Sequence, residues 1–557
     1  MSVDRATAES STPAADFDVV IVGAGFAGMY MLHRVRALGL SARLLEAGAG
    51  VGGTWFWNRY PGARCDIESM EYSFQFSEEL QQTWHWTERY AGQAEIVRYA
   101  NHVADRFGLR VDMQFNTRVE AATFDEAGNR WQVRACGENP QATILLTGRF
   151  LVMATGCLSS ANLPAFKGMQ TYTGERYHTG LWPDRKVDFT GKRVAVIGTG
   201  SSAVQSIPLI AQEAAGLVVF QRTATYSIPA RNGPQDADYE ARIKADYAAF
   251  RARNSRMPNA FGSTYPRNET SALEVALDER ERAFEERWQR GGLGFLGAFG
   301  DLILSSAANE TAAEFVRRKI RAVVQDPAVA DLLAPRQVIG CKRMCIDSGY
   351  YETFNRPNVR LVDISSAPIE ELTPVGLRCG GRDFEFDCII FATGFDAMTG
   401  TLLKIDIRGR GGRTLAEKWQ AGPRTYLGLA IEGFPNLFTI SGPGSPSVLT
   451  NMIVSIEQHV DWIAECMAYM HEHGHARIEA SSGAEDAWVE HVNAVADRTL
   501  YPTCNSWYLG VNVPGKTRVF MPLVGFPTYV EKTRDVAALG YEGIPIQAQN
   551  GLAHIAG

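Results

Sequence analysis

The chain has 557 residues with a formal net charge of -7 at pH 7, and its 45% hydrophobic and 21% charged residues are typical of a globular protein. This length is too great for one core and predicts roughly three domain-sized units. No basic tract is available to neutralise phosphates, which argues against a nucleic-acid partner. Nine cysteines without a CxxC pair favour a reduced protein over a disulfide framework.

Neither a signal peptide nor a membrane span is expected. Residues 1–16 are polar and lack an apolar stretch, which predicts a disordered arm and no secretory signal. No run of about 18 apolar residues follows in the chain. We therefore expect a cytoplasmic protein without a membrane partner.

A first nucleotide-binding motif opens the ordered part of the chain. The apolar run DVVIV at residues 18–22 leads into GAGFAG, with Gly23, Gly25 and Gly28, and then into a helical pattern. Strand, glycines and helix in this order predict a dinucleotide fold, in which the glycines allow a tight turn and close approach of a pyrophosphate. The next strand ends at Glu46, where a carboxylate can accept both ribose hydroxyls; the alternative is a surface acid.

The segment after Glu46 is dense in glycine and aromatic residues. It reads GVGGTWFWNRYPGARCDIESMEYSF from residue 50. Aromatic rings beside glycine backbone suit the binding of a flat ring system, and the alternative is an aromatic core cluster. Farther on, ATG at residues 154–156 follows an apolar strand and indicates a crossing between domains.

A second nucleotide-binding motif repeats the design. The run KRVAVIG ends at Gly198 and continues as GTGSSA, with Gly200 and with Ala203 at the third position, which the motif allows. The following strand ends at Arg222 and Thr223 instead of an acid. An arginine there can bind a 2′-phosphate, so we predict NADP rather than NAD; the alternative is a solvated strand end.

One chain with an FAD-type site and an NADP-type site is built to pass hydride from NADPH to a flavin. The predicted fold class is α/β, with two Rossmann-like dinucleotide-binding domains and a mainly helical insertion rich in charge. We expect a disordered arm at 1–16, an FAD-binding domain from 17–156 and 385–557, an NADP-binding domain from 157–228 and 336–384, and the helical insertion at 229–335.

No other catalytic centre stands out. His471, His473 and His475 are interpreted as exposed histidines at a helix end rather than a metal site. Cys341 and Cys345 do not match the reactive pair of flavin disulfide reductases. We therefore expect cofactor chemistry and no metal.

The stretch YTGERYHTGLWP at residues 172–183 lies between the two motifs. Gly174, His178 and Trp182 follow one another at intervals of four residues. Taken alone, this spacing would fit a turn of a linker helix that ends at a proline. It resembles the fingerprint FxGxxxHxxxWP of Baeyer-Villiger monooxygenases, with Tyr172 in place of the leading Phe. Likewise GGTWFWNRYPGARCD resembles the family pattern GGxWxxxxYPGxxxD. The resemblance covers residues 17–545, and GPGSPSVLTNMIVSIEQHV and NSWYLGVNVPGK are most similar to the phenylacetone and steroid monooxygenases of that family.

This resemblance implies an enzyme that holds FAD and uses NADPH and O2 to insert oxygen beside a ketone carbonyl, through a C4a-peroxyflavin, giving an ester or lactone. It implies a bulky aryl, large-ring or steroidal ketone and no separate reductase. The alternatives are a flavin N- or S-monooxygenase, against which Trp182 and Pro183 speak, and an NADPH-flavin oxidoreductase without oxygen insertion.

The resemblance also implies roles for individual residues. Arg343 would stabilise developing negative charge, with Asp66 holding its guanidinium, a role that a permanently charged planar group suits; the alternative is a pair of surface cations, Lys342 and Arg343. His178 would fix the junction between domains rather than act in catalysis.

The expected FAD contacts beyond the first motif are Thr54, Trp55, Phe56, Trp57, Asp66, Tyr72, Val119 and Met452. The expected NADP contacts are Arg64, Cys65, Gly198, Gly200, Ser201, Ser202, Ala203, Val204, Gln205, Ser206, Arg222, Thr223, Lys342, Arg343 and Trp507. The expected substrate contacts are Ile67, Ser447, Val448, Leu449 and Met452, and the fingerprint positions are Tyr172, Gly174, His178, Trp182 and Pro183.

Overall fold

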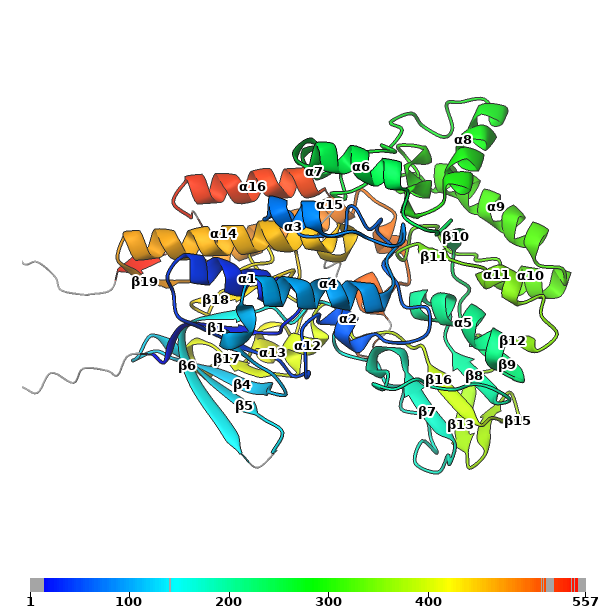
Figure 1. Ribbon diagram of the computed structural model, residues 1–557, viewed down its shortest axis with the longest axis horizontal. Helices are drawn as coiled ribbons and strands as arrows, with labels where there is room; N and C mark the ends of the chain where they lie inside the picture. Colours follow the sequence, from blue (N-terminus) through cyan, green and yellow to red (C-terminus); the bar gives the residue numbers. More distant parts are fainter. Residues whose placement is uncertain are drawn as a thin grey trace, which may run out of the picture.

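The computed structural model describes residues 15–139, 142–511, 513, 515–516, 525–541, 543–544 and 546–548, so nearly all of the expected arm lies outside the described residues. Two separate sheets carry the two nucleotide-binding motifs (Figure 1). The α/β class predicted from the sequence is confirmed, with parallel strands at the centre of each sheet.

The first sheet contains the first motif and has eight strands in the order β17-β4-β5-β6-β1-β2-β3, with β18 paired to β6. Along β1, Val19 and Ile21 pack into the large core with α1 and α14, whereas Val20 and Val22 pack into the core on the opposite face. Because both faces are covered, the strand is apolar from Val19 to Val22. The strands are β1 (Phe17–Val22), β2 (Ala42–Leu45), β3 (Met113–Gln114), β4 (Arg118–Asp125), β5 (Arg130–Cys136), β6 (Thr143–Met153), β17 (Asp406–Arg408) and β18 (Leu437–Thr439).

Helices α1 (Phe26–Ala37) and α14 (Met452–Glu472) lie side by side on the first sheet, and α4 (Gln93–Arg106) is seen below α14 and to the right of α1 in Figure 1. Helix α14 ends at Glu472, so His471 and His473 lie at a helix end as the sequence indicates. Shorter elements of this half are α2 (Thr54–Trp57), α3 (Glu78–Thr83), η1 (Leu109–Asp112), α12 (Gly400–Leu403), η4 (Arg410–Gly412), α13 (Leu415–Lys418) and η5 (Ser447–Leu449). The C-terminal elements are β19 (His475–Ile478), α15 (Ser482–Ala496), η6 (Tyr501–Thr503), η7 (Trp507–Leu509), α16 (Phe526–Ala538) and β20 (Ile546–Ala548).

The second sheet contains the second motif, and its five strands are all parallel in the order β12-β9-β8-β16-β7. Its strands are β7 (Glu175–His178), β8 (Arg193–Ile197), β9 (Gly216–Gln221), β12 (Val359–Asp363) and β16 (Cys388–Phe391). Helix α5 (Ser201–Glu213) covers one face. A small sheet of β13 (Ile369–Thr373), β14 (Gly376–Cys379) and β15 (Arg382–Glu385) covers the other.

The position of β16 corrects the domain boundary expected at residue 385. Because β16 pairs with β7 and β8, the chain leaves the second sheet only after Phe391. The apolar run of β16 is typical of a buried strand, but its composition does not say which of two parallel sheets it enters.

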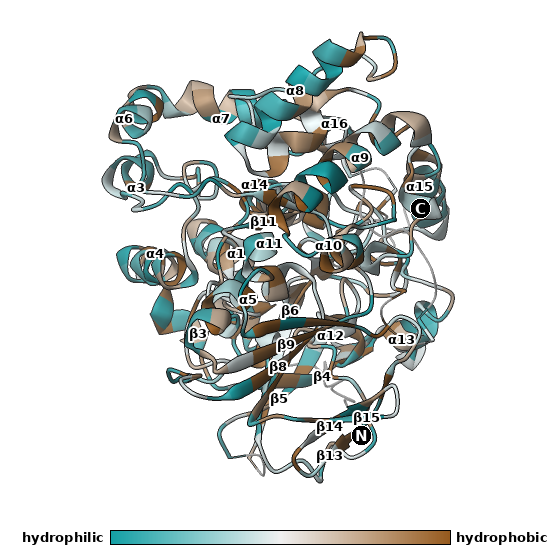
Figure 2. Ribbon diagram, turned by 90° about the vertical axis from the view of Figure 1, so that its right-hand side faces the viewer, coloured by the Kyte–Doolittle hydropathy of each residue, from teal (hydrophilic) through white to brown (hydrophobic). Residues whose placement is uncertain are grey.

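Helices occupy most of residues 229–335, as the sequence indicates. They are α6 (Ala237–Ala245), α7 (Tyr247–Ser255), α8 (Leu277–Arg290), η3 (Leu293–Ala298), α9 (Ser306–Val323) and α10 (Pro327–Leu333). Figure 2 shows hydrophilic residues over α6 and much of α8. The inner faces are apolar, because Phe284, Phe295 and Phe315 pack with α5, whereas Ile243 and Phe250 pack into the core of the first sheet. The insertion therefore contacts both halves of the molecule.

Two cysteines depart from the sequence-based expectation. Cys341 and Cys504 form a disulfide, whereas the other seven cysteines are free thiols. They are 163 residues apart, so only the tertiary fold brings them together. Among the described residues, no helix is long and apolar enough to cross a membrane.

Candidate active site

The glycines of the first motif leave backbone exposed at the end of β1. Gly23 has φ +106°, and a Cβ there would lie 2.6 Å from the Ala154 carbonyl oxygen, so neither the conformation nor the space admits a side chain. Gly25 precedes α1. A Cβ on Gly53 would lie 2.8 Å from the Cα of Gly25. The GGTW segment therefore packs directly on the first motif, and the two segments form one site.

Glu46 lies at the end of β2 beside this glycine loop. Its Oε2 accepts the Ala24 N–H at 2.7 Å and its Oε1 accepts the Gly48 N–H at 2.6 Å. Burial raises the pKa of this carboxyl, although the two backbone donors and the charge of Arg118 oppose the rise. The alternative of a surface acid is wrong, because Glu46 is only 5% exposed. The Thr117 N–H donates to the Glu46 carbonyl at 2.8 Å. This bond brings the start of β4, with Val119, next to Glu46.

The aromatic residues after Gly53 form the next part of this site. Trp55 is buried and donates from Nε1 to the Tyr72 hydroxyl at 3.0 Å, whereas Phe56 and Trp57 are half-buried and Thr54 is exposed. Arg59 covers the Phe56 ring at 4.3 Å. Glycine backbone, a buried carboxylate and accessible rings together fit FAD.

The second motif forms an equivalent site at the start of α5. Gly198 has φ +110°, and Gly200 precedes the helix. Gly200 and Ser201 are exposed and Ser202 is half-buried, so this N-terminus can bind a pyrophosphate. In contrast, the Ala203, Val204 and Ser206 side chains are buried, and Ser206 donates to the Ser202 carbonyl at 2.8 Å. Their buried side chains position α5, and their expected contacts with NADP stay a prediction.

Two cations converge at the end of β9. Arg222 and Thr223 are exposed, and Lys342 is half-buried. Burial, followed by the nearby charge of Arg222, lowers the pKa of Lys342. Within the part of the chain that the structure describes, neither cation has a salt-bridge partner. Two unpaired cations from distant segments fit the 2′-phosphate of NADP.

Arg343 and Asp66 form the centre of the candidate active site. The Arg343 guanidinium donates from Nε and Nη2 to the two Asp66 carboxylate oxygens at 2.5 and 3.0 Å, and from Nη1 to the Val448 carbonyl at 2.6 Å. Burial opposes the charge, but the Asp66 carboxylate outweighs burial and raises the pKa of Arg343. The alternative of a surface cation is wrong for Arg343, which is held in a two-point ion pair.

Apolar residues and tyrosines surround this ion pair. Ile67, Val448 and Leu449 are buried, and the expected substrate contact Ser447 starts the 3-10 turn η5 with φ +41°. Met452 is half-buried at the start of α14.

Three tyrosines beside the ion pair were missed by the sequence reasoning. The charge of Arg343 acts on the pKa of Tyr501 and Tyr508, and the charge of Asp66 acts on that of Tyr60, although burial is the largest cause for each. Burial raises the pKa of Tyr501 to about 12. The Tyr508 ring is tilted by 50° against the ring of the half-buried Trp507, with the centroids 4.3 Å apart. The position of Tyr508 directly after Trp507 in the sequence was the signal that could have pointed to it.

The Arg64 side chain has partners inside its own loop. Its guanidinium donates to the Glu88 carboxylate at 2.7 Å and to the Tyr90 carbonyl at 2.9 Å. The side chain therefore braces the loop, and its expected contact with NADP stays a prediction. The Arg64 carbonyl accepts from Gln205 Nε2 at 3.2 Å, while Gln205 Oε1 accepts the Tyr60 hydroxyl at 2.8 Å. Cys65 is buried, which raises the pKa of its thiol.

The fingerprint stretch is a strand and a 3-10 turn, so the alternative of a linker helix is wrong. Glu175–His178 forms β7, and Thr179–Leu181 forms η2. His178 Nδ1 accepts the Gly180 N–H at 3.0 Å, and its Nε2 lies 3.3 Å from the Thr393 hydroxyl. Burial lowers the pKa of His178 to about 4, so the ring is neutral near pH 7.

The rest of the fingerprint packs or joins the two halves. Tyr172 donates to the Phe386 carbonyl at 3.0 Å, and it leaves Gly174 no room for a side chain. Trp182 is buried against Tyr177. After Pro183, Asp184 pairs with Arg59 of the first site at 2.6 Å. The stretch therefore belongs to the second sheet, and the residue that follows it contacts the first site.

Comparisons with known proteins agree with this geometry. The family description pyridine nucleotide-disulphide oxidoreductase matches residues 20–249. A Baeyer-Villiger monooxygenase from Pseudooceanicola batsensis is 42% identical, over 97% of this chain and 98% of the relative. The chain belongs to the Baeyer-Villiger monooxygenase family. The solved structure of an oxidized steroid monooxygenase bound to NADP is 53% identical, with a TM-score of 0.90 over 95% of this chain and 99% of that one.

Family membership confirms the enzyme class predicted from the sequence. The chain is an FAD- and NADPH-dependent Baeyer-Villiger monooxygenase. A phenazine N-monooxygenase from Lysobacter antibioticus is also 40% identical, over 95% of this chain and 96% of the relative. A relative named for oxygen transfer to nitrogen is therefore about as similar to this chain as the relative named as a Baeyer-Villiger monooxygenase.

Proposed function

We propose that Arg343, fixed by Asp66, stabilises the negative charge that develops on the carbonyl oxygen of a ketone during oxygen insertion. The observation that carries this proposal is the two-point ion pair, with its third donor bound to the Val448 carbonyl. A guanidinium held at three points needs little reorganisation when charge develops beside it. Its charge is also permanent at any working pH.

The cofactor sites support the same proposal. Bound FAD, reduced by NADPH, supplies the oxygen-activating chemistry. The half-buried glycine backbone at Gly23 and Gly25, with the Glu46 carboxylate, would hold FAD. The α5 N-terminus, Arg222 and Lys342 would hold NADPH, and Trp507 would cover it. Because both sites lie in one chain, we propose that no separate reductase is required.

The proposed substrate is a ketone with a bulky apolar body, of the aryl, large-ring or steroidal kind. Ile67, Val448, Leu449 and Met452 present apolar side chains near Arg343, and they suit a hydrocarbon skeleton. The similarity to a steroid monooxygenase at 53% identity supports the same size class.

A ketone panel under 18O2 tests this function. Small cyclic, aryl, large-ring and steroidal ketones would be offered with NADPH, and products analysed by mass spectrometry. We expect one labelled oxygen in an ester or lactone, with the highest kcat/KM among the bulky ketones. Labelled N-oxide from an added phenazine, without ester from any ketone, would instead favour the N-monooxygenase alternative. Hydrogen peroxide as the only product would contradict both.

A further inference from the structure

We propose that Cys341 and Cys504 are a reversible redox site, whose disulfide ties the segment that carries Trp507 to the loop that carries Arg343. As two thiols they would no longer restrain movement of that segment. The effect of this tether on cofactor release rests on the proposed position of Trp507 over NADP, whereas the redox chemistry of the pair does not.

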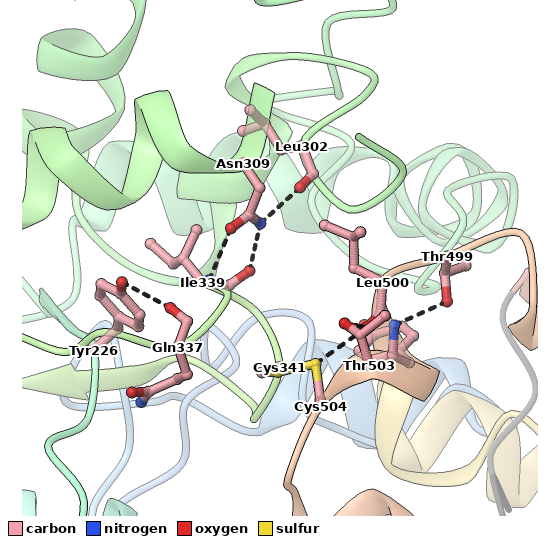
Figure 3. The surroundings of a disulfide bond; sticks show 11 residues. Tyr226, Leu302, Asn309, Gln337, Ile339, Cys341, Thr499, Leu500, Thr503 and Cys504 are labelled. Carbon is pink, nitrogen blue, oxygen red and sulfur yellow. Dashed lines mark hydrogen bonds between the residues drawn. A yellow bond between two sulfur atoms is a disulfide. The ribbon is translucent and has the colours of Figure 1, made fainter. Parts of the chain in front are cut away.

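The two sulfurs lie between functional residues on two segments. Cys341 directly precedes Lys342 and Arg343, and Cys504 is three residues before Trp507. Their Cα atoms are 5.7 Å apart (Figure 3), and the residues are 3% and 2% exposed. The disulfide therefore joins the two functional segments inside the protein.

The Cys341 loop is fixed to the helical insertion. Asn309 of α9 donates from Nδ2 to the carbonyls of Leu302 and Ile339, and its Oδ1 accepts the Ile339 N–H at 3.0 Å (Figure 3). The Cys341 N–H donates to Val338 in a tight turn. This side of the disulfide is consequently an anchor, and Cys504 is on the side that can move.

The segment from Cys504 to residue 511 is held both by burial and by contacts on either side of it. Tyr508 and Leu509 are buried in the large core. Leu500, just before the segment, donates its N–H to the Ile303 carbonyl at 2.9 Å. Beyond it, Lys516 pairs with Asp396 at 2.6 Å and donates to the Ala397 carbonyl at 2.7 Å. The disulfide adds a covalent link to the Cys341 loop, and its loss would leave the segment held by non-covalent contacts.

The redox step balances with a peroxide as oxidant. One thiolate attacks the O–O bond, giving a sulfenic acid and hydroxide, which takes up a proton as the first water. The second thiol displaces the sulfenic hydroxyl as a second water, and the S–S bond forms. Overall two thiols lose two electrons to one peroxide, which becomes two waters. A dithiol returns the pair to thiols through a mixed disulfide.

Thiol labelling tests the redox site without any measurement of activity. The FAD-loaded enzyme would be treated with dithiothreitol or hydrogen peroxide, alkylated and mapped by peptide mass spectrometry. We expect alkyl groups on Cys341 and Cys504 after dithiothreitol and their loss after peroxide. Two free thiols under both conditions, or a disulfide that dithiothreitol leaves intact in the folded enzyme, would overturn the proposal.

The release rate of NADP+ tests the tether. We expect release to be about tenfold slower from the oxidised than from the reduced enzyme, because a tethered segment opens less readily. Cys504→Ala should release NADP+ at the fast rate whatever its redox treatment, whereas Cys379→Ala, at a free thiol of β14, should respond like the wild type. Equal rates in both redox states would refute the tether. If no ketone in the panel were converted to an ester, the thiol-labelling and NADP+-release results would still stand on their own.

Discussion

Arg343 shows how one side chain can combine burial with permanent charge. Leaving a guanidinium inside the protein without a partner would be costly, but Asp66 offers two oxygens and Val448 a third acceptor. The arrangement leaves the guanidinium in one orientation. A charge in a fixed position can stabilise a transition state better than the same charge on a mobile side chain.

Arg343→Ala should abolish ester formation while flavin reduction by NADPH continues. Removal of one donor for a developing oxyanion typically costs on the order of 10²- to 10³-fold in kcat. Stopped-flow absorbance would follow the reduction, and gas chromatography would quantify the ester. Arg343→Lys is the matched control and should recover only part of the rate, since an ammonium does not form the two-point pair. Wild-type ester yields from the alanine variant would disprove the assigned role.

Arg222→Ala should raise the KM for NADPH and narrow its preference over NADH. A charge-assisted contact to phosphate contributes about 1.5–3 kcal/mol, which corresponds to a roughly 10- to 100-fold loss in kcat/KM for NADPH alone. Steady-state rates with both cofactors measure this ratio. Arg222 is exposed at the end of β9, so the melting temperature should stay close to that of the wild type. An unchanged ratio would exclude contact with the 2′-phosphate.

At the scale of elements, the fingerprint stretch contributes strand β7 to the second sheet and leads to a contact with the first site. Strand β7 is the edge strand of the second sheet, and its last residue, His178, lies beside Thr393 where the chain leaves that sheet. Asp184, after η2, reaches Arg59 of the first site. His178 is neutral near pH 7, and its ring contacts Gly180 and Thr393 rather than Arg343 or Asp66. Its structural position therefore supports a role in the junction rather than in proton transfer.

The stability of the wild-type enzyme should fall more steeply below pH 6.5 than that of His178→Asn. The pKa of His178 is about 4 in the folded protein and near 6.5 when unfolded, so the unfolded state binds more protons between these values. Protonation then favours unfolding, and stability rises with pH across this window. Melting temperatures from pH 4 to 8 would measure the slopes. His471→Asn, at an exposed helix end, should keep the wild-type slope, and equal slopes for all three proteins would contradict the prediction.

Gly62→Ala should destabilise the contact between α5 and the loop that carries Asp66. Gly62 has φ +80°, and a Cβ would collide with the Gln205 carbonyl of α5. We expect a fall in melting temperature and a higher KM for NADPH. Gly39→Ala is the matched control: its φ is +72° but nothing lies within 4 Å, so it isolates the backbone strain of about 1–2 kcal/mol. If both variants melt alike, the contact with α5 contributes nothing.

The elements that the sequence predicted well are those whose signal is local. Gly23, Glu46 and Gly200 lie within single strand-turn-helix units, where spacing alone fixes their relation to a nucleotide. The pairing of Arg343 with Asp66 spans 277 residues, and only the family resemblance indicated it. The Cys341–Cys504 disulfide, the Arg64–Glu88 pair and the sheet that β16 enters depend on tertiary packing, so the sequence pattern did not reveal them.

At the scale of the whole molecule, the two nucleotide sites rest on separate cores. The core of the first sheet includes α1 and α14, and that of the second includes α5 and the inner faces of α8 and α9. The two halves are joined by the helical insertion, by the Cys341–Cys504 disulfide, and by polar contacts of Arg343 with Asp66, Tyr60 with Gln205 and Arg59 with Asp184. Delivery of hydride followed by oxygen insertion requires relative movement of the halves, which these contacts would have to accommodate.

Removal of FAD should therefore loosen the first half of the molecule more than the second. Ligand at 100 times its Kd stabilises the state that binds it by about 2.7 kcal/mol, and this is lost only where the ligand couples to folding. Hydrogen exchange of apoenzyme and holoenzyme, read by mass spectrometry, should show faster exchange in α1, β2 and residues 52–57. Amides of β8 and β9 should keep their protection, whereas NADP+ should slow exchange chiefly around the α5 N-terminus. A uniform loss over both sheets on FAD removal would mean that the two cores unfold as one unit, and movement between them would then need another origin.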